Sequence, residues 1–189
     1  SAASDVYKRQ VSLLLLPKTC ITPLDHASSG IYIHQDKINS DQAELSIITK
    51  VNSNRAEKDL AVRTSIFDAQ GKLVSNHITR KSTGKEETVE FINKQSIEHP
   101  VLWDGRQSPH LYRVLVEVLK GNMVVDSLSQ HTGLRYYTVD ADKGFFLNGK
   151  PYKIKGVNRH QDRADKGWAI TNNCLLYTSP SPRDGLLSR

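Results

Sequence analysis

The chain has 189 residues and a formal net charge of +6, from 26 Lys and Arg against 20 Asp and Glu. This positive excess is scattered rather than gathered into a basic run with interleaved aromatic residues, which argues against a nucleic-acid-binding protein. No apolar run approaches the roughly 20 residues of a membrane-spanning helix, so we expect no membrane partner.

Both ends of the chain carry sequence that we expect to be foreign to the protein. Residues 1–10 (SAASDVYKRQ) and 174–189 (CLLYTSPSPRDGLLSR) can each be back-translated into the adapter DNA of a common sequencing library. Such scars are excluded from fold reasoning, which leaves residues 11–173 as a fragment open at both ends. Its single Cys20 forms neither an intrachain disulfide nor a metal site, and no cellular compartment is assigned.

The first informative element is the apolar run Val11–Leu16, which Pro17 ends. A short apolar run bounded by proline is typical of a buried strand. We therefore expect the last strand of a domain whose earlier part is missing. Residues 18–29, with Pro23 and the breaker Ser28-Ser29-Gly30, form the connection that follows.

From Gly30 onward the apolar residues alternate with polar ones, as in the half-buried strands of a sheet. Turn residues at 68–71 and 121–122 separate successive alternating segments. Turns at this spacing, without a long helical period, predict an antiparallel β-sandwich. The expected strands cover residues 30–34, 45–50, 61–67, 72–79, 88–92, 112–119 and 123–129.

A tryptophan lies between two prolines in the segment 100–112, PVLWDGRQSPHLY. Trp103 at the entry to a strand is most simply a packing corner. The alternative is a ring that stacks against a sugar.

The stretch Phe145–Trp168 follows the exit segment Arg135-Tyr136-Tyr137. Its residues 145–147 and 152–154 flank Asn148-Gly149, a strong two-residue hairpin signal. Next, Lys155–Asn158 is typical of a short strand, and a dense run of polar side chains follows directly after it. Polar residues at the C-terminal end of a strand are where α/β barrels keep their sites.

At these residues the chain resembles a known family. FFLNGKPYKIKGVNRHQD resembles the start of the catalytic barrel of family-2 glycoside hydrolases, and LWDGRxxPxLY and GLRYY resemble parts of their immunoglobulin-like domain. The resemblance implies a mainly β chain: an immunoglobulin-like antiparallel β-sandwich followed by the first strand of a truncated (β/α)8 barrel. Its domains would be the last strand of a jelly-roll sugar-binding domain at 11–17, the sandwich with its linkers at 18–138, and the barrel start at 139–173.

Within the family, GVNRHQDRADKGWA is most similar to the β-galactosidase branch. The β-glucuronidase branch usually has Lys where Arg159 stands. The best-known β-galactosidases carry Glu-His where this chain has Gln161-Asp162, a variant that occurs in a subset of the family. The resemblance therefore implies a retaining β-galactosidase that hydrolyses terminal β-D-galactosides. A β-glucuronidase or a β-mannosidase is the alternative within the family, and a non-catalytic carbohydrate-binding module is the alternative outside it.

The resemblance also implies roles for the polar residues after the hairpin. His160 matches the family histidine that hydrogen-bonds the sugar. Asp162 is the second expected substrate contact, and its alternative is an ion pair with a neighbouring arginine. Asn158, Arg159 and Trp168 would support that site, and the alternative for each is a purely structural role. The two catalytic glutamates of a retaining glycosidase lie on later barrel strands, so no catalytic residue is assigned and the fragment is expected to be inactive.

For cofactors and partners, the resemblance implies a β-galactoside substrate and a homo-oligomeric parent protein. The remaining histidines are scattered without ligand spacing, so no metal site is assigned in the fragment. Magnesium is implied only for the full-length parent, through residues outside this sequence.

Overall fold

The structure, a computed structural model, describes residues 13–156 and shows eleven antiparallel β-strands and no helix within that range. None of these residues therefore forms a helix that could cross a membrane. Residues 15–153 form one compact unit, which contains all eleven strands.

One sheet is built around the central strand β3 (Gln42–Ser53). Strand β6 (Glu87–Glu98) pairs with β3 along its whole length. The other edge of β3 is shared by β1 (Thr19–Ile21) and β2 (Ile31–Ile38), which pair with successive parts of it.

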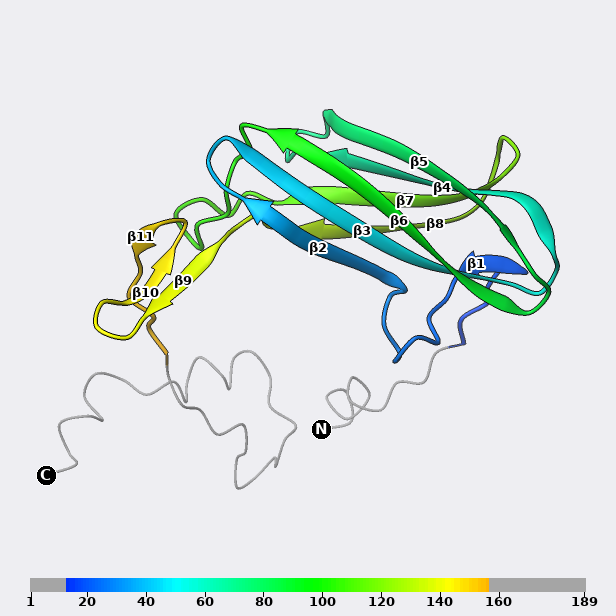
Figure 1. Ribbon diagram of the computed structural model, residues 1–189, viewed down its shortest axis with the longest axis horizontal. Coiled ribbons are helices and arrows are strands. Elements are labelled where there is room, and N and C mark those ends of the chain that lie inside the picture. The colour runs from blue at the N-terminus through cyan, green and yellow to red at the C-terminus, as the bar shows by residue number, and fades with distance from the viewer. Residues whose placement is uncertain (1–12, 157–189) are drawn as a thin grey trace, which may run out of the picture. The chain divides into compact units, whose positions relative to one another are not determined.

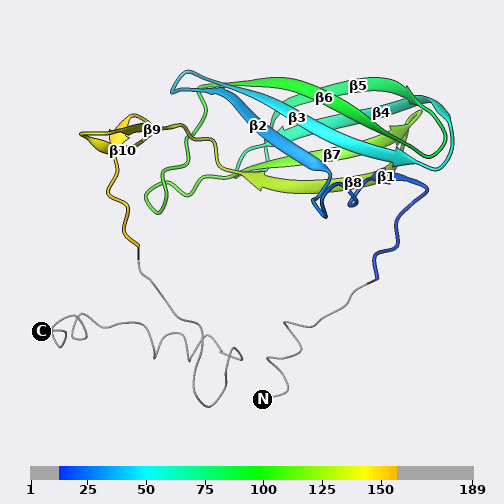
Figure 2. The same ribbon diagram turned by 60° about the horizontal axis from the view of Figure 1, so that its bottom comes forward.

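The second sheet has the order β5-β4-β7-β8. Its strands span Leu73–Thr83 (β5), Glu57–Phe67 (β4), Tyr112–Lys120 (β7) and Met123–Thr132 (β8). The two sheets lie face to face (Figures 1 and 2), and side chains of both contribute to one buried cluster between them. The predicted antiparallel β-sandwich is thereby confirmed.

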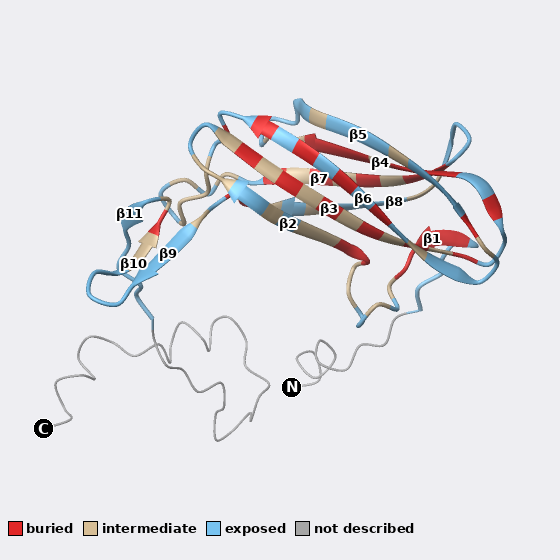
Figure 3. Ribbon diagram, in the orientation of Figure 1, coloured by how far each residue is buried: buried red, intermediate tan, exposed pale blue. Residues whose placement is uncertain are grey.

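The alternation in the sequence reappears as alternation of burial. Along β3 every second side chain is buried, which gives the regular stripes of Figure 3. The facing strand β7 buries Val114, Val116 and Val118 completely. Each such side chain contributes roughly 1.5–3 kcal/mol when fully removed from water, so these stripes hold the two sheets together.

Buried polar side chains of β6 form hydrogen bonds to the opposite sheet. Asn93 is buried on β6, and its Nδ2 donates to Thr64 Oγ1 on β4 at 2.6 Å. Two positions further on, Gln95 Nε2 donates to the backbone oxygen of Thr64 at 3.1 Å. Buried amides are tolerated when they are paired in this way, and here they join strands of different sheets.

A third, small sheet follows the sandwich and has the order β11-β10-β9. It comprises β9 (Tyr137–Asp140), β10 (Gly144–Leu147) and β11 (Lys150–Pro151). The predicted hairpin is confirmed: Leu147 pairs with Lys150, and Asn148 and Gly149 between them both have positive φ, 51° and 77°. Two positive φ values define the tight turn that Asn-Gly favours.

The described strands differ from the expected ones in four respects. Strand β1 lies within residues 18–29, which were expected to form a connection. Leu13–Leu16, the described part of Val11–Leu16, is exposed and lies outside any strand, because no described strand pairs with it. Lys155 and Gly156, the described part of the expected barrel strand, are also not in a strand, and residues 157 and 158 lie outside the described range. Strand β9 was not expected from the sequence.

Candidate functional site

The residues that the sequence singled out as substrate-facing lie outside the described part of the chain. This applies to His160 and Asp162 and equally to the supporting residues Asn158, Arg159 and Trp168. Their roles stay predictions. The structure does show how the polypeptide is held just before it reaches them.

Trp103 is a packing residue of this exit region. Its backbone N–H donates to the oxygen of Leu134 at 2.8 Å, and the guanidinium of Arg135 lies 5.2 Å from the ring centroid. A Cβ on Gly133 would come within 2.8 Å of the Trp103 side chain, so the glycine is needed for this close approach. Of the two interpretations of Trp103, the packing corner is therefore the one that the contacts support.

Asn148 anchors the β10–β11 hairpin to the sandwich. Its Nδ2 donates to the backbone oxygen of Trp103 at 3.0 Å, and its Oδ1 accepts from the N–H of Tyr136 at 3.2 Å. Its own N–H donates to the oxygen of Tyr136 at 2.9 Å. One side chain thus ties together the loop before β7, the exit from β8 and the hairpin that leads toward residue 157.

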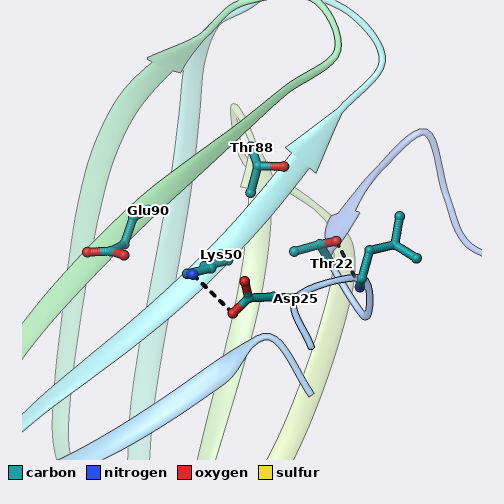
Figure 4. A pocket seen from close by; sticks show the side chains of 6 residues that line it. Thr22, Asp25, Lys50, Thr88 and Glu90 are labelled. Atoms are coloured by element: carbon teal, nitrogen blue, oxygen red, sulfur yellow. Dashed lines mark hydrogen bonds and ion pairs between the residues drawn. The ribbon is translucent and has the colours of Figure 1, made fainter. Parts of the chain in front are cut away.

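An open pocket of about 420 Å³ lies beside the connection between β1 and β2 (Figure 4). Asp25 from that connection pairs with Lys50 of β3 at 3.0 Å, and the hydroxyl of Tyr32 donates to the same carboxylate. Thr88 and Glu90 of β6 form the opposite side. Because the one ammonium group in this pocket is already paired, we interpret the cluster as a tie that holds the connection to the sheet.

The interaction of Asp25 with Lys50 and Tyr32 should depend on pH, because the carboxylate must be ionised. The hydrogen bond from Tyr32 and then the one from Lys50 lower the pKa of Asp25 below its ordinary value of 3.8. A carboxylate with a lowered pKa stabilises the folded state above its ordinary pKa, and that contribution is lost as the pH falls through the lowered value. We expect the connection to loosen only below about pH 3.8, measured as faster amide exchange at Thr22 and Ser28.

The Asp25→Asn variant is the matched control for this expectation. Its amide cannot titrate in this range, so the difference in exchange between the two proteins should shrink as the pH falls. A constant difference across the acid range would contradict the role given to the ionised carboxylate.

A second groove, of about 480 Å³, lies between the edge of β2 and the exit segment. It is lined by residues 33–36, Ile38 and residues 135–137. Its side chains are mixed, with tyrosine rings and isoleucines beside a carboxylate, an imidazole and a guanidinium. No local sequence pattern predicts this groove, because its two walls are about a hundred residues apart in the chain.

No metal site is formed by the described residues, since no three His, Cys, Asp or Glu side chains among them converge. Cys20, which is buried on β1, has its thiol pKa raised by burial and then by the nearby Asp126 carboxylate. It is thus a poor thiolate ligand or nucleophile at neutral pH.

Comparison with known proteins shows which family this sequence belongs to. Residues 27–135 match the family described as "Glycosyl hydrolases family 2", and this range is more than half of the chain. The chain belongs to glycosyl hydrolase family 2. The match covers β2 to the end of β8 and the exit segment that carries Arg135.

Two curated relatives and one solved structure are similar to this chain, and they are named for two different activities. A β-glucuronidase of Bacteroides fragilis is 39% identical over 163 residues, covering 86% of this chain and 23% of its own length. A β-galactosidase of Bacteroides ovatus is 32% identical, covering 81% and 18%. The crystal structure of a Bacteroides uniformis β-glucuronidase superposes with a TM-score of 0.76 at 31% identity, covering 84% and 19%.

The family-2 chain thus spans about a fifth of the length of the relatives that it matches. Its relatives include enzymes named for two different sugars. The comparisons therefore show the family of this chain, and they do not decide between glucuronide and galactoside as the substrate of the whole enzyme.

Proposed function

We propose that this chain is a segment of a retaining β-glycosidase of family 2, and that the whole enzyme is a β-glucuronidase. The observation that carries the proposal is the 39% identity to the Bacteroides fragilis β-glucuronidase over 163 residues. The superposition on a Bacteroides uniformis β-glucuronidase supports the same sugar. This replaces the β-galactoside favoured by the sequence pattern.

β-Galactosidase remains the second candidate, for one specific reason. Arg159 stands where the β-glucuronidase branch usually carries Lys, and the Bacteroides ovatus β-galactosidase is 32% identical. Arginine and lysine are not interchangeable where a planar fork holds a carboxylate, so the difference bears on the site.

In the proposed enzyme the sandwich is the immunoglobulin-like domain, with the end of a jelly-roll domain before it and the start of the catalytic barrel after it. Retaining hydrolysis needs an acid/base and a nucleophile whose carboxyl groups lie about 5–5.5 Å apart. The family resemblance places both beyond this chain. The part that we propose for this chain is one wall of the sugar site, with His160 and Asp162 contacting hydroxyl groups.

The hydrogen bonds of Asn148 support the proposed role of His160 and Asp162 in the sugar site. A side chain contributes to a sugar site only when its backbone is held in place, and the hairpin that precedes His160 is tied to the sandwich by three hydrogen bonds of Asn148. Magnesium and homo-oligomeric assembly are proposed for the whole enzyme only.

The proposal is tested with two polypeptides and two substrates. The purified 189-residue chain should hydrolyse neither 4-nitrophenyl β-glucuronide nor 4-nitrophenyl β-galactoside. A longer polypeptide that contains this segment and the catalytic glutamates should prefer the glucuronide in kcat/KM by about 100-fold or more, because a site built to pair a charged group rejects analogues that lack it.

Each result has a counterpart that would overturn part of the proposal. A preference for the galactoside would establish the second candidate. Turnover by the 189-residue chain itself would show that the catalytic carboxylates lie within it. In the longer polypeptide, an unchanged kcat/KM for His160→Ala would remove that residue from the sugar site.

A further inference from the structure

We propose that the groove between β2 and residues 135–137 is a saccharide-binding site, with Tyr137 as the platform for one sugar ring. The proposal concerns binding and rests on the side chains of the groove. It does not depend on which glycoside the whole enzyme hydrolyses. The groove has a volume of about 480 Å³ and is open to solvent.

Tyr137 provides an aromatic surface that is already supported from one side. Its ring stacks on Phe145, with centroids 5.8 Å apart and an interplanar angle of 24°. The residue is nevertheless 66% exposed. A sugar ring has one face made mainly of C–H groups, and such a face packs well against an exposed aromatic ring.

Polar groups that match sugar hydroxyls face the same groove. The imidazole of His34 and the hydroxyl of Tyr137 belong to residues that line it. Asp36 accepts from Ser46 Oγ at 2.5 Å and keeps further lone pairs on its carboxylate. Sugar hydroxyls both donate and accept, so they can use a carboxylate, an imidazole and a phenol together.

The walls of the groove are fixed before any ligand arrives. Gln35 Nε2 donates to the oxygen of Gly133 at 3.1 Å, and Gln35 Oε1 accepts from the N–H of Arg135 at 3.0 Å. Arg135 Nη1 donates to the same Gly133 oxygen at 3.1 Å. A site whose walls are held in this way loses little conformational freedom on binding, which favours affinity.

The pocket at Asp25 lacks this combination. It has no aromatic residue in its lining, and Lys50 is engaged with Asp25. The aromatic platform and the carboxylate, imidazole and phenol beside it therefore single out the groove next to β2.

The test uses the 189-residue chain with methyl β-D-glucuronide and methyl β-D-galactoside as probes. We expect saturation transfer from protein to sugar for at least one probe at millimolar concentration. Amide shifts should be confined to residues 33–38 and 135–137. Tyr137→Ser should weaken binding by about five-fold or more through loss of the stacking surface, and Asp36→Asn should weaken it by about ten-fold through loss of a charged acceptor.

Val139→Ser is the matched control, because Val139 lies on the same strand, is 73% exposed and does not line the groove. It should bind as the parent chain does. The proposal is overturned if neither probe binds, if the shifts map to Lys50 and Glu90, or if Val139→Ser weakens binding as much as Tyr137→Ser. Dimerisation that Tyr137→Ser abolishes, without sugar binding, would assign the groove to protein contact instead.

Discussion

Replacing Phe91 with alanine is expected to lower the free energy of unfolding by about 3–5 kcal/mol. Phe91 lies on β6 with 0% exposure and is the largest fully buried side chain of the core. Its removal exchanges a ring that is packed between the sheets for a cavity that the two rigid layers cannot close. Because small domains are stable by only about 5–15 kcal/mol, this one change removes a large part of the total.

The neighbouring residue gives the control for Phe91. Ile92 follows it on β6 and points to the opposite face, where it is 43% exposed. Ile92→Ala should therefore cost less than about 1 kcal/mol. Urea denaturation followed by circular dichroism measures both midpoints, and equal midpoints for the two variants would contradict the placement of the core. If Phe91→Ala does not fold, the smaller cavity of Phe91→Leu keeps the comparison possible.

The core was predictable because it depends on a local rule. Side chains alternate across a strand, so Leu45, Ile47 and the valines of β7 can be assigned to the interior from their spacing alone. The turns at 68–71 and 121–122 are similarly local, since Gly71 and Gly121 have φ values of 82° and 60° that glycine adopts without strain.

The alternation of apolar and polar residues does not predict a strand where buried polar side chains are satisfied by tertiary contacts. Residues 88–92 were predicted as a short strand, but β6 continues to Glu98 because Asn93 and Gln95 face inward and find partners on Thr64 of the other sheet. Those partners are about thirty residues away in the chain. Leu13–Leu16 differ from the expectation in the opposite sense, since they are exposed and lie outside any strand. An apolar run is buried only when a partner strand is present to cover it.

The groove and the hairpin anchor show why sites are harder to predict than cores. Gln35 lies just beyond the strand expected at residues 30–34, and only the fold reveals that it bonds Gly133 and Arg135. Asn148 was predicted from the sequence as a turn residue. Its contact with Trp103 depends on two loops that meet in space, so its anchoring function was not predictable.

Replacing Asn148 with alanine is expected to destabilise the β10–β11 hairpin by about 2–5 kcal/mol. Two side-chain hydrogen bonds are lost, at about 0.5–1.5 kcal/mol each. Alanine must also adopt the φ of 51° that asparagine tolerates in this turn, at a further cost of about 1–2 kcal/mol. The small sheet contributes little to the core, so the loss should appear as local opening rather than as global unfolding.

Amide hydrogen exchange at Tyr152, whose N–H donates to Phe145 O at 2.9 Å, reports this opening directly. We expect Asn148→Ala to speed exchange there by about 30-fold or more, since each 1.4 kcal/mol is a factor of ten. Core amides of β7 should keep their protection. Faster exchange throughout the sandwich would show instead that the hairpin and core open together.

Asn148→Gly separates the two causes, because glycine accepts the positive φ and lacks only the side-chain bonds. If the bonds to Trp103 and Tyr136 provide most of the anchor, the glycine variant should open nearly as readily as the alanine variant. If backbone strain dominates, the glycine variant should remain close to the parent chain. In a longer, active polypeptide, we expect the first outcome also to lower kcat/KM for both variants, because the hairpin that precedes His160 in the chain would be less firmly held on the sandwich.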